Sequence, residues 1–199
     1  MRDTIRECEH AGHTDGLAVG LGKALSGTAI SAAPGGIAAV PSILVAEGAP
    51  VIPHEMASRE GISFVRSGPS PAAPAELTAL GARLGAVRLG VTRRLVERVV
   101  EHLAHRIVGG EPTLRKQLVQ GTLADARLGI EAARRCLLVA GHLGVAVADV
   151  HDRLTALDWE LAKLLGASGY VGQGPASSAY VSRLTANCWI RREGVSCPS

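Results

Sequence analysis

The chain has 199 residues, enough to bury one main core, and aromatic residues make up only 3% of it. A core of small aliphatic side chains favours close helix packing over a β-sandwich, so the composition indicates an all-α protein. The net charge of +3 is small and the arginines do not cluster with aromatics, which argues against a nucleic-acid-binding protein.

The cysteines lie far apart and show no C-x-x-C spacing; they are Cys8, Cys136, Cys188 and Cys197. With no secretory signal in the first residues, this pattern predicts reduced thiols in a cytoplasmic protein, with no disulfide and no metal site. Gly and Pro interrupt the apolar stretches before they could span a bilayer, so we expect no membrane segment. Abundant Arg, Ala and Gly indicate a high-GC bacterial source.

Residues 1–73 form the first of two expected regions, an irregular Gly- and Pro-rich N-terminal extension. Within it we predict a short helix over residues 16–25 and short strands over residues 37–45 and 62–65. Three prolines between residues 67 and 74 then form a linker that ends at a helix start.

Residues 74–199 form the second region, in which apolar side chains recur at steps of three and four residues. The first stripe predicts a long helix and contains Leu77, Leu80, Leu84, Val87, Val91, Leu95 and Val99. Gly109 and Gly110 end this helix. The second stripe runs from Leu123 to Ala140 and the third from Val147 to Leu164, and a shorter helix is expected over residues 176–190. Since each helix can hide its apolar face only against the others, we predict an antiparallel four-helix bundle.

Two turns of the predicted bundle carry motifs in the order and spacing found in one enzyme family. At the first turn the pattern Arg, Gly, Pro, Gln is matched without a gap by Arg106, Gly110, Pro112 and Gln117. At the later turn, residues 166–170 resemble a Gly-Gly-x-Gly-Tyr sequence. Residues 76–194 thus resemble the C-terminal helical domain of the acyl-CoA dehydrogenases.

In that family these turns help to hold FAD, because an arginine neutralises a pyrophosphate and a turn without side chains lets backbone amides approach it. The resemblance implies cofactor-binding roles for Arg106, Gly110, Gln117, Gly166 and Gly169. The sequence departs from the family where Gly109 replaces an aromatic residue, Ala167 a glycine and Lys163 a glutamine. The extension is also too short to hold the family's N-terminal and middle domains, so we expect a flavin-free protein with no cofactor.

Two residues are candidates for acid/base chemistry. Glu193, followed by Gly194, lies one residue out of register with the family's catalytic glutamate, and the favoured alternative is a solvated residue near the chain terminus. His102 stands one helical turn from His105, a spacing that suits a metal or a substrate proton. The family has a tyrosine at the position of His102, which favours packing. Asp149 and His151 are expected on the solvated surface of their helix.

The aromatic residues gather near the later turn and the last helix. Trp159, Tyr170 and Tyr180, together with Trp189, either line a ligand cleft or plug the end of the bundle. The residues leave both interpretations open.

Three functions follow from these observations. The preferred one is a flavin-free enzyme that performs a cyclisation or elimination on an acyl or polyketide-like intermediate of specialised metabolism. The alternatives are one subunit of an FAD-dependent acyl thioester dehydrogenase, with a larger dehydrogenase subunit as its partner, and a non-catalytic interaction module. Because the first two long helices carry apolar residues off their main stripes, such as Leu89, Val96, Leu103 and Leu118, we also predict a homodimer or higher homo-oligomer. The competing interpretation is that the N-terminal segment folds back and covers this surface.

Overall fold

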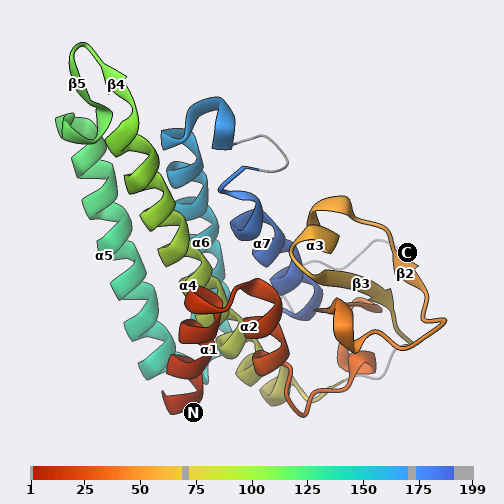
Figure 1. The fold of residues 1–199 in the computed structure, drawn as a ribbon. Helices are drawn as coiled ribbons and strands as arrows, with labels where there is room; N and C mark the ends of the chain where they lie inside the picture. The colour runs from red at the N-terminus through yellow and green to blue at the C-terminus, as the bar shows by residue number, and fades with distance from the viewer. Residues whose placement is uncertain (1, 69–71, 170–173, 191–199) are drawn as a thin grey trace, which may run out of the picture.

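The computed structural model describes residues 2–68, 72–169 and 174–190. Its largest part is a bundle of the helices α4 (Pro74–His105), α5 (Gln117–Ala140), α6 (Gly144–Leu164) and α7 (Ser177–Trp189). Figure 1 shows α4, α5 and α6 side by side, with α7 beside α6 on the other edge. The predicted all-α bundle is confirmed.

The helix boundaries follow from the local sequence. Pro74 occupies the first turn of α4, where its missing N–H costs nothing. After His105 the chain turns through a two-stranded hairpin of β4 (Ile107–Val108) and β5 (Glu111–Pro112). Gly109 and Gly110 connect these strands with φ of 68° and 82°, in the left-handed region that favours glycine. The break predicted at the paired glycines is present, but the helix already ends at His105 and the glycines form the tight turn of the hairpin.

The segment before the bundle is more regular than its Gly and Pro content suggests. It contains α1 (Arg2–Thr14), α2 (Leu17–Ala24), α3 (Glu55–Arg59) and a small antiparallel sheet of β1 (Ile37–Pro41), β2 (Val51–Ile52) and β3 (Ile62–Arg66), in the order β1-β3-β2. The predicted short helix is α2, and the two predicted strands are β1, which ends at Pro41 and not near residue 45, and β3. Helices α1 and α3 and strand β2 were not expected. Four 3-10 turns also occur in the described ranges: η1 (Ile30–Ala32), η2 (Ser42–Leu44), η3 (Thr113–Arg115) and η4 (Gly166–Gly169).

Helix α1 crosses α4 at very short range, and glycines make this possible. A Cβ atom added to Gly90 would lie 2.2 Å from the carbonyl oxygen of Glu9, and one added to Gly12 would lie 2.3 Å from that of Val87. Real side chains do not approach a backbone so closely. The two helix backbones are therefore in direct contact, and α1 is an integral part of the core.

An ion cluster fixes the same crossing. Glu9 is 5% exposed, and its carboxylate accepts hydrogen bonds from Arg93 on α4 at 2.9 Å and from Arg134 on α5 at 2.6 and 2.8 Å. Burial acts to raise the pKa of Glu9, but the two guanidiniums outweigh it and leave the pKa below its ordinary value. The charged form of Glu9 therefore joins α1 to two bundle helices.

At its other end, the N-terminal segment shares the core of the bundle. The indole Nε1 of Trp189, a fully buried side chain on α7, donates to the carbonyl oxygen of Ala39 on β1 at 2.9 Å. Buried residues of both regions form one apolar cluster. The division of the chain near residue 74 stays a prediction; α4 begins there, but the two regions pack as one body.

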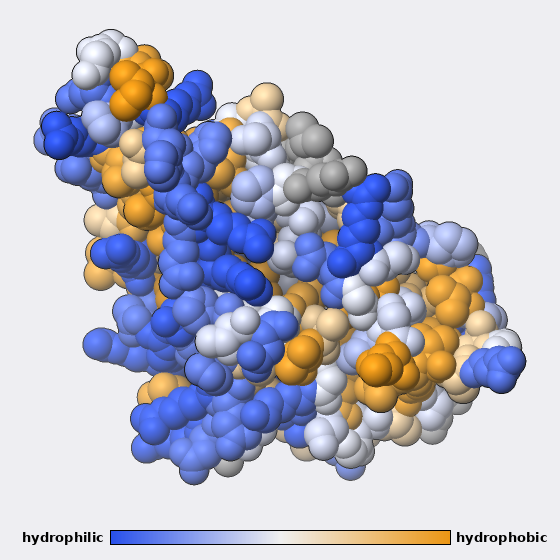
Figure 2. Space-filling view, in the orientation of Figure 1, coloured by the Kyte–Doolittle hydropathy of each residue, from blue (hydrophilic) through white to orange (hydrophobic). Residues whose placement is uncertain are grey.

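Apolar side chains are exposed in several parts of the described surface. In Figure 2 they gather at the tip of the β4–β5 hairpin and over the part of the molecule that holds the small sheet. Exposed apolar residues of these segments are Ile107, Val108, Ile43, Leu44 and Val51. No helix in the described ranges is long and apolar enough to cross a membrane.

Candidate functional site

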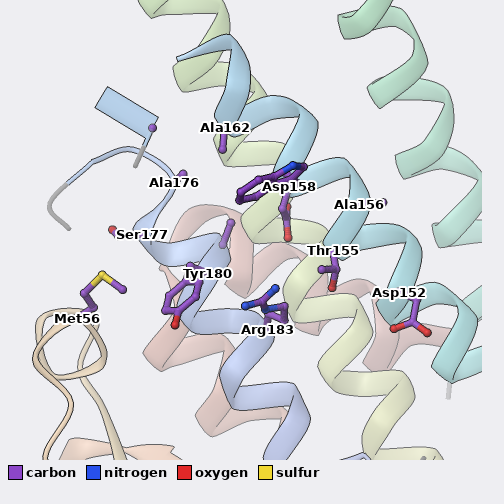
Figure 3. A pocket seen from close by; sticks show the side chains of 13 residues that line it. Met56, Asp152, Thr155, Ala156, Asp158, Ala162, Ala176, Ser177, Tyr180 and Arg183 are labelled. Carbon is purple, nitrogen blue, oxygen red and sulfur yellow. The ribbon is translucent and has the colours of Figure 1, made fainter. Parts of the chain in front are cut away.

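A pocket of about 580 Å³ lies between α6 and α7 (Figure 3). One wall comes from α6 and the other from α7, and Met56 of α3 lies at one side. The lining residues that carry polar or aromatic groups are Asp152, Thr155, Asp158, Trp159, Ser177, Tyr180 and Arg183. We call this cavity the α6–α7 pocket.

Asp158 is the carboxylate in this pocket with the most constrained surroundings. Its side chain is 11% exposed, and one oxygen accepts a hydrogen bond from the Thr92 hydroxyl at 2.7 Å. The other oxygen lies 3.3 Å from Nη2 of Arg88, which is 3% exposed. Burial raises the pKa of Asp158, against the opposing attraction of the Arg88 guanidinium. A carboxyl group held in this way beside a cavity is suited to exchanging a proton with a bound molecule.

Arg88 is positioned by a face of α6. Its Nη1 donates to the carbonyl oxygen of His151 at 2.9 Å, and its Nη2 donates to the Thr155 hydroxyl at 3.1 Å. His151, Thr155 and Asp158 recur at steps of four and three residues, so that α6 presents them on one side. The guanidinium therefore bridges α4 and α6 and holds Asp158 in place.

The predicted cleft residues that the structure describes both line this pocket. Trp159 is 56% exposed and Tyr180 is 41% exposed, although both are large apolar side chains. The Arg183 guanidinium lies 5.3 Å from the centre of the Tyr180 ring, a cation–π contact within one helix. Figure 3 shows Tyr180 and Arg183 beside each other on α7, with Arg183 between α7 and α6. Tyr170 lies outside the described residues.

The two motif-bearing turns also meet. Gly166, with φ of 60°, approaches Arg106 so closely that an added Cβ would lie 3.4 Å from its Nη1. A Cβ on Gly169 would lie 2.3 Å from the carbonyl oxygen of Ala162, so this position accepts only glycine. Gly110 lies at the exposed hairpin tip, and Gln117 is exposed at the start of α5. The structure therefore brings Arg106 and Gly166 together and leaves Gly110 and Gln117 at the surface.

Comparison with known proteins identifies the bundle. Residues 82–171 match the family "Acyl-CoA dehydrogenase, C-terminal domain". This stretch is an acyl-CoA dehydrogenase C-terminal domain. A search of curated proteins gave no match.

Solved structures show the same fold. Butyryl-CoA dehydrogenase of Megasphaera elsdenii is 17% identical over 78% of this chain and 45% of that chain, with a TM-score of 0.57. A glutaryl-CoA dehydrogenase of Mycobacterium smegmatis, solved in complex with FADH2, is 18% identical over 70% of this chain and 45% of that chain, with a TM-score of 0.54. A chain of the ChsE4-ChsE5 complex of Mycobacterium tuberculosis is 17% identical over 72% of this chain and 46% of that chain, with a TM-score of 0.51. This chain spans less than half the length of each.

The two residues predicted for acid/base chemistry lie apart from the α6–α7 pocket or beyond the described part. His102 is half-buried on α4 of the acyl-CoA dehydrogenase domain and does not line the pocket. Its Nε2 is buried and finds no hydrogen-bond partner in the described ranges. Glu193 falls outside the described residues. Their catalytic roles stay predictions.

His151 corrects one expectation and shows why such predictions fail. It was expected on a solvated face, but it is 1% exposed and its Nε2 lies 2.9 Å from the carbonyl oxygen of Gly81. Gly85, on the next turn of α4, has no side chain, and a Cβ there would lie 3.4 Å from this Nε2, so the ring can approach the α4 backbone. Asp149 is exposed as expected and pairs with Arg153.

Sequence reasoning missed Arg88 and Asp158, although each left a signal. Arg88 stands between Val87 and Leu89 in an apolar run, and Asp158 lies four residues after Leu154 on a helix with a strong apolar stripe. Buried charges require partners. Two charges of opposite sign within apolar stripes of neighbouring helices therefore suggest a pair.

Proposed function

We propose that this protein is a flavin-free enzyme that performs acid/base chemistry on an acyl or polyketide-like intermediate in the α6–α7 pocket, as part of bacterial specialised metabolism. The observation that carries this proposal is Asp158, a buried carboxyl with a raised pKa at the wall of a largely apolar cavity. Cyclisation and elimination both begin when a carbon next to a carbonyl group loses a proton.

The side chains of the pocket divide the work of such a step. Asp158 takes the proton from carbon, and the same proton later returns to the substrate or leaves with the departing group, so no oxidant is needed. Arg183 offers donors to the oxygen on which negative charge develops. The exposed ring faces of Trp159 and Tyr180 offer contacts to an apolar chain.

Replacement of Asp158 by asparagine tests the proposal. The wild-type protein is expected to catalyse deuterium uptake from D2O at the carbon next to the carbonyl of a short β-keto thioester. In the Asp158→Asn variant the rate is expected to fall by about 10²–10⁴-fold, the usual contribution of a positioned acid/base group. Mass spectrometry of the recovered thioester measures the uptake.

The matched control is Asp149→Asn, on the same helix but outside the pocket. It is expected to keep the wild-type rate. Circular dichroism of both variants separates loss of chemistry from loss of fold. An Asp158→Asn variant that folds and exchanges as fast as the wild type contradicts the proposal.

A second candidate is a subunit of an FAD-dependent acyl thioester dehydrogenase, which the approach of Arg106 to Gly166 favours. In this case Arg106 would neutralise the cofactor's pyrophosphate and the Gly166 turn would let it approach the backbone, while bound FAD would accept the hydride from the substrate. The ChsE4-ChsE5 complex among the similar structures is a precedent for a two-component assembly of this fold. Saturable FAD binding that is lost in Arg106→Ala would establish this candidate over the first.

We also propose that the protein self-associates through the outer face of α5. The predicted contribution of α4 is wrong, because Leu89, Val96 and Leu103 are buried within the chain itself. On α5, Leu118, Leu128 and Val139 are exposed by 87%, 69% and 72% and lie within one third of the helix circumference.

The self-association proposal predicts a dimer or larger species of the 20.5 kDa chain in sedimentation at micromolar concentration. Replacement of Leu128 by glutamate is expected to shift it to the monomer, because a charge would replace apolar area in the contact. A monomeric wild-type protein contradicts the proposal.

A further inference from the structure

A second pocket, of about 630 Å³, lies between the N-terminal segment and the bundle. Residues of α1, α2, α3 and the turn between α1 and α2 form one side, and α4 and the start of α7 form the other. The charged and hydroxyl side chains that line it are Arg59, Glu60, Arg94, Arg98, Ser177 and Ser178. We call this cavity the arginine pocket.

The charges of the arginine pocket are unbalanced. Three guanidiniums line it against one carboxylate, that of Glu60, and of the three only Arg59 is paired with a carboxylate, that of Glu55 on the same helix. This carboxylate accepts hydrogen bonds from the hydroxyls of Ser177 at 3.0 Å and Ser178 at 2.8 Å, on the first turn of α7. Its acceptors are thus engaged by hydroxyl groups, and no ion pair between Glu60 and an arginine occurs in the described part of the chain.

Two of the arginines keep donors available. Arg98 donates to the carbonyl oxygen of Pro175 at 3.5 Å, which engages one of its five N–H groups. Arg94 is half-buried and makes no hydrogen bond or ion pair within residues 2–68, 72–169 and 174–190. Its Nη1 reaches the turn between α1 and α2, 3.7 Å from where a Cβ on Gly16 would lie. A half-buried guanidinium with free donors is suited to an anion.

The arginine pocket and the α6–α7 pocket adjoin. Met56 and Ser177 line both, and Figure 3 shows these two residues on the same side of the α6–α7 pocket. One cavity is largely apolar with exposed aromatic rings, and the other is cationic. Together they match a molecule with an apolar body and a charged end.

We propose that the arginine pocket binds the phosphate group of an amphipathic ligand whose apolar part occupies the α6–α7 pocket. Arg94 and Arg98 bind the phosphate oxygens, whereas Arg59 is already paired with Glu55. A phosphate monoester fits better than a carboxylate because it carries nearly two charges and three acceptor oxygens, enough for two guanidinium forks. The N-terminal segment thereby becomes part of the ligand site. This inference extends the proposed function by naming the class of ligand.

Binding of decyl phosphate, decanoate and decanol tests the proposal, with Trp159 fluorescence as the readout. Trp159 lies in the α6–α7 pocket and is exposed, whereas Trp189 is fully buried and hydrogen-bonded, so a ligand changes mainly the emission of Trp159. Decyl phosphate is expected to bind at least tenfold more tightly than decanoate. Arg94→Gln and Arg98→Gln are each expected to weaken decyl phosphate binding about tenfold and decanol binding less than twofold.

Arg127→Gln on α5 is the matched control, since Arg127 is exposed and lines neither pocket. It is expected to leave all three affinities unchanged. Equal weakening of decyl phosphate and decanol by the pocket variants would mean a structural role for the arginines and overturn the proposal. Equal affinity for decanoate and decyl phosphate would overturn the preference for phosphate.

The binding test is independent of the proton-transfer test. Phosphate binding that depends on Arg94, together with full exchange activity in Asp158→Asn, would reject the proposed enzyme and keep the arginine pocket. If Asp158→Asn loses exchange activity and the arginine variants bind decyl phosphate as the wild type does, the proposed enzyme is kept and the arginine pocket is rejected.

Discussion

Replacement of Gly90 by alanine is expected to lower the free energy of unfolding by about 3 kcal/mol, the upper end of the usual cost of overpacking. In an ordinary helix the same change is stabilising, because alanine has the higher helix propensity. Here the added methyl would lie 2.2 Å from the carbonyl oxygen of Glu9 and 2.6 Å from the backbone nitrogen of His13. Both are backbone atoms, so α1 must move as a whole.

Gly121→Ala is the matched control for this prediction. Gly121 also lies within a long helix, α5, but no atom comes within 4 Å of an added Cβ. This variant is expected to be more stable than the wild type by about 0.5–1 kcal/mol. Urea unfolding followed by circular dichroism measures both changes. Stabilisation of both variants would show that α1 and α4 are farther apart than described.

The sequence predicts the bundle well because its signal is periodic. The stripe from Leu77 to Val99 fixes which face of α4 is buried, and the same holds for α5 and α6. Helix α1 was not predicted because its apolar face is narrow: the buried Ile5, Cys8 and Ala11 are separated by charged and polar residues. The close contact of Gly12 with the α4 backbone fixes the position of α1, but it depends on how the two helices pack and cannot be read from the sequence of either one.

The candidate site was less predictable than the fold. Trp159 and Tyr180 were predicted as cleft residues because large side chains are rare in this chain. Arg88 and Asp158 are 70 residues apart; their places in the apolar stripes predict that each is buried and paired, but not which residue is the partner. The arginine pocket also requires α3 to lie against α7, a contact between segments more than a hundred residues apart.

Replacement of Arg88 by methionine is expected to destabilise the protein by about 3–5 kcal/mol at neutral pH, the usual cost of removing one partner of a buried ion pair. Because methionine fills much of the same volume as arginine, the loss of stability comes from the missing positive charge and its hydrogen bonds. The variant leaves Asp158 in a site that is 11% exposed with one hydrogen bond, from Thr92. It also removes the donors to Thr155 and to the carbonyl oxygen of His151.

The pH dependence of this variant distinguishes the loss of charge pairing from a packing defect. Without Arg88, the folded-state pKa of Asp158 rises further above its unfolded value of about 3.9. The unpaired charge therefore destabilises the variant above the folded-state pKa, and stability returns as acidification protonates the group, down to about pH 4. The difference in unfolding free energy between Arg88→Met and the wild type should therefore shrink as the pH falls over this range. Urea unfolding at several pH values measures it.

The double variant Arg88→Met/Asp158→Asn completes the cycle. Since neither member of the pair then carries a charge, the double variant is expected to recover most of the stability lost in Arg88→Met. Its difference in unfolding free energy from the wild type should not shrink on acidification as that of Arg88→Met does. A double variant that is less stable than Arg88→Met would instead mean that Asp158 contributes through Thr92 alone. In that case the pair would not be the element that couples α4 to α6, and the carboxyl at the wall of the pocket would be free to move.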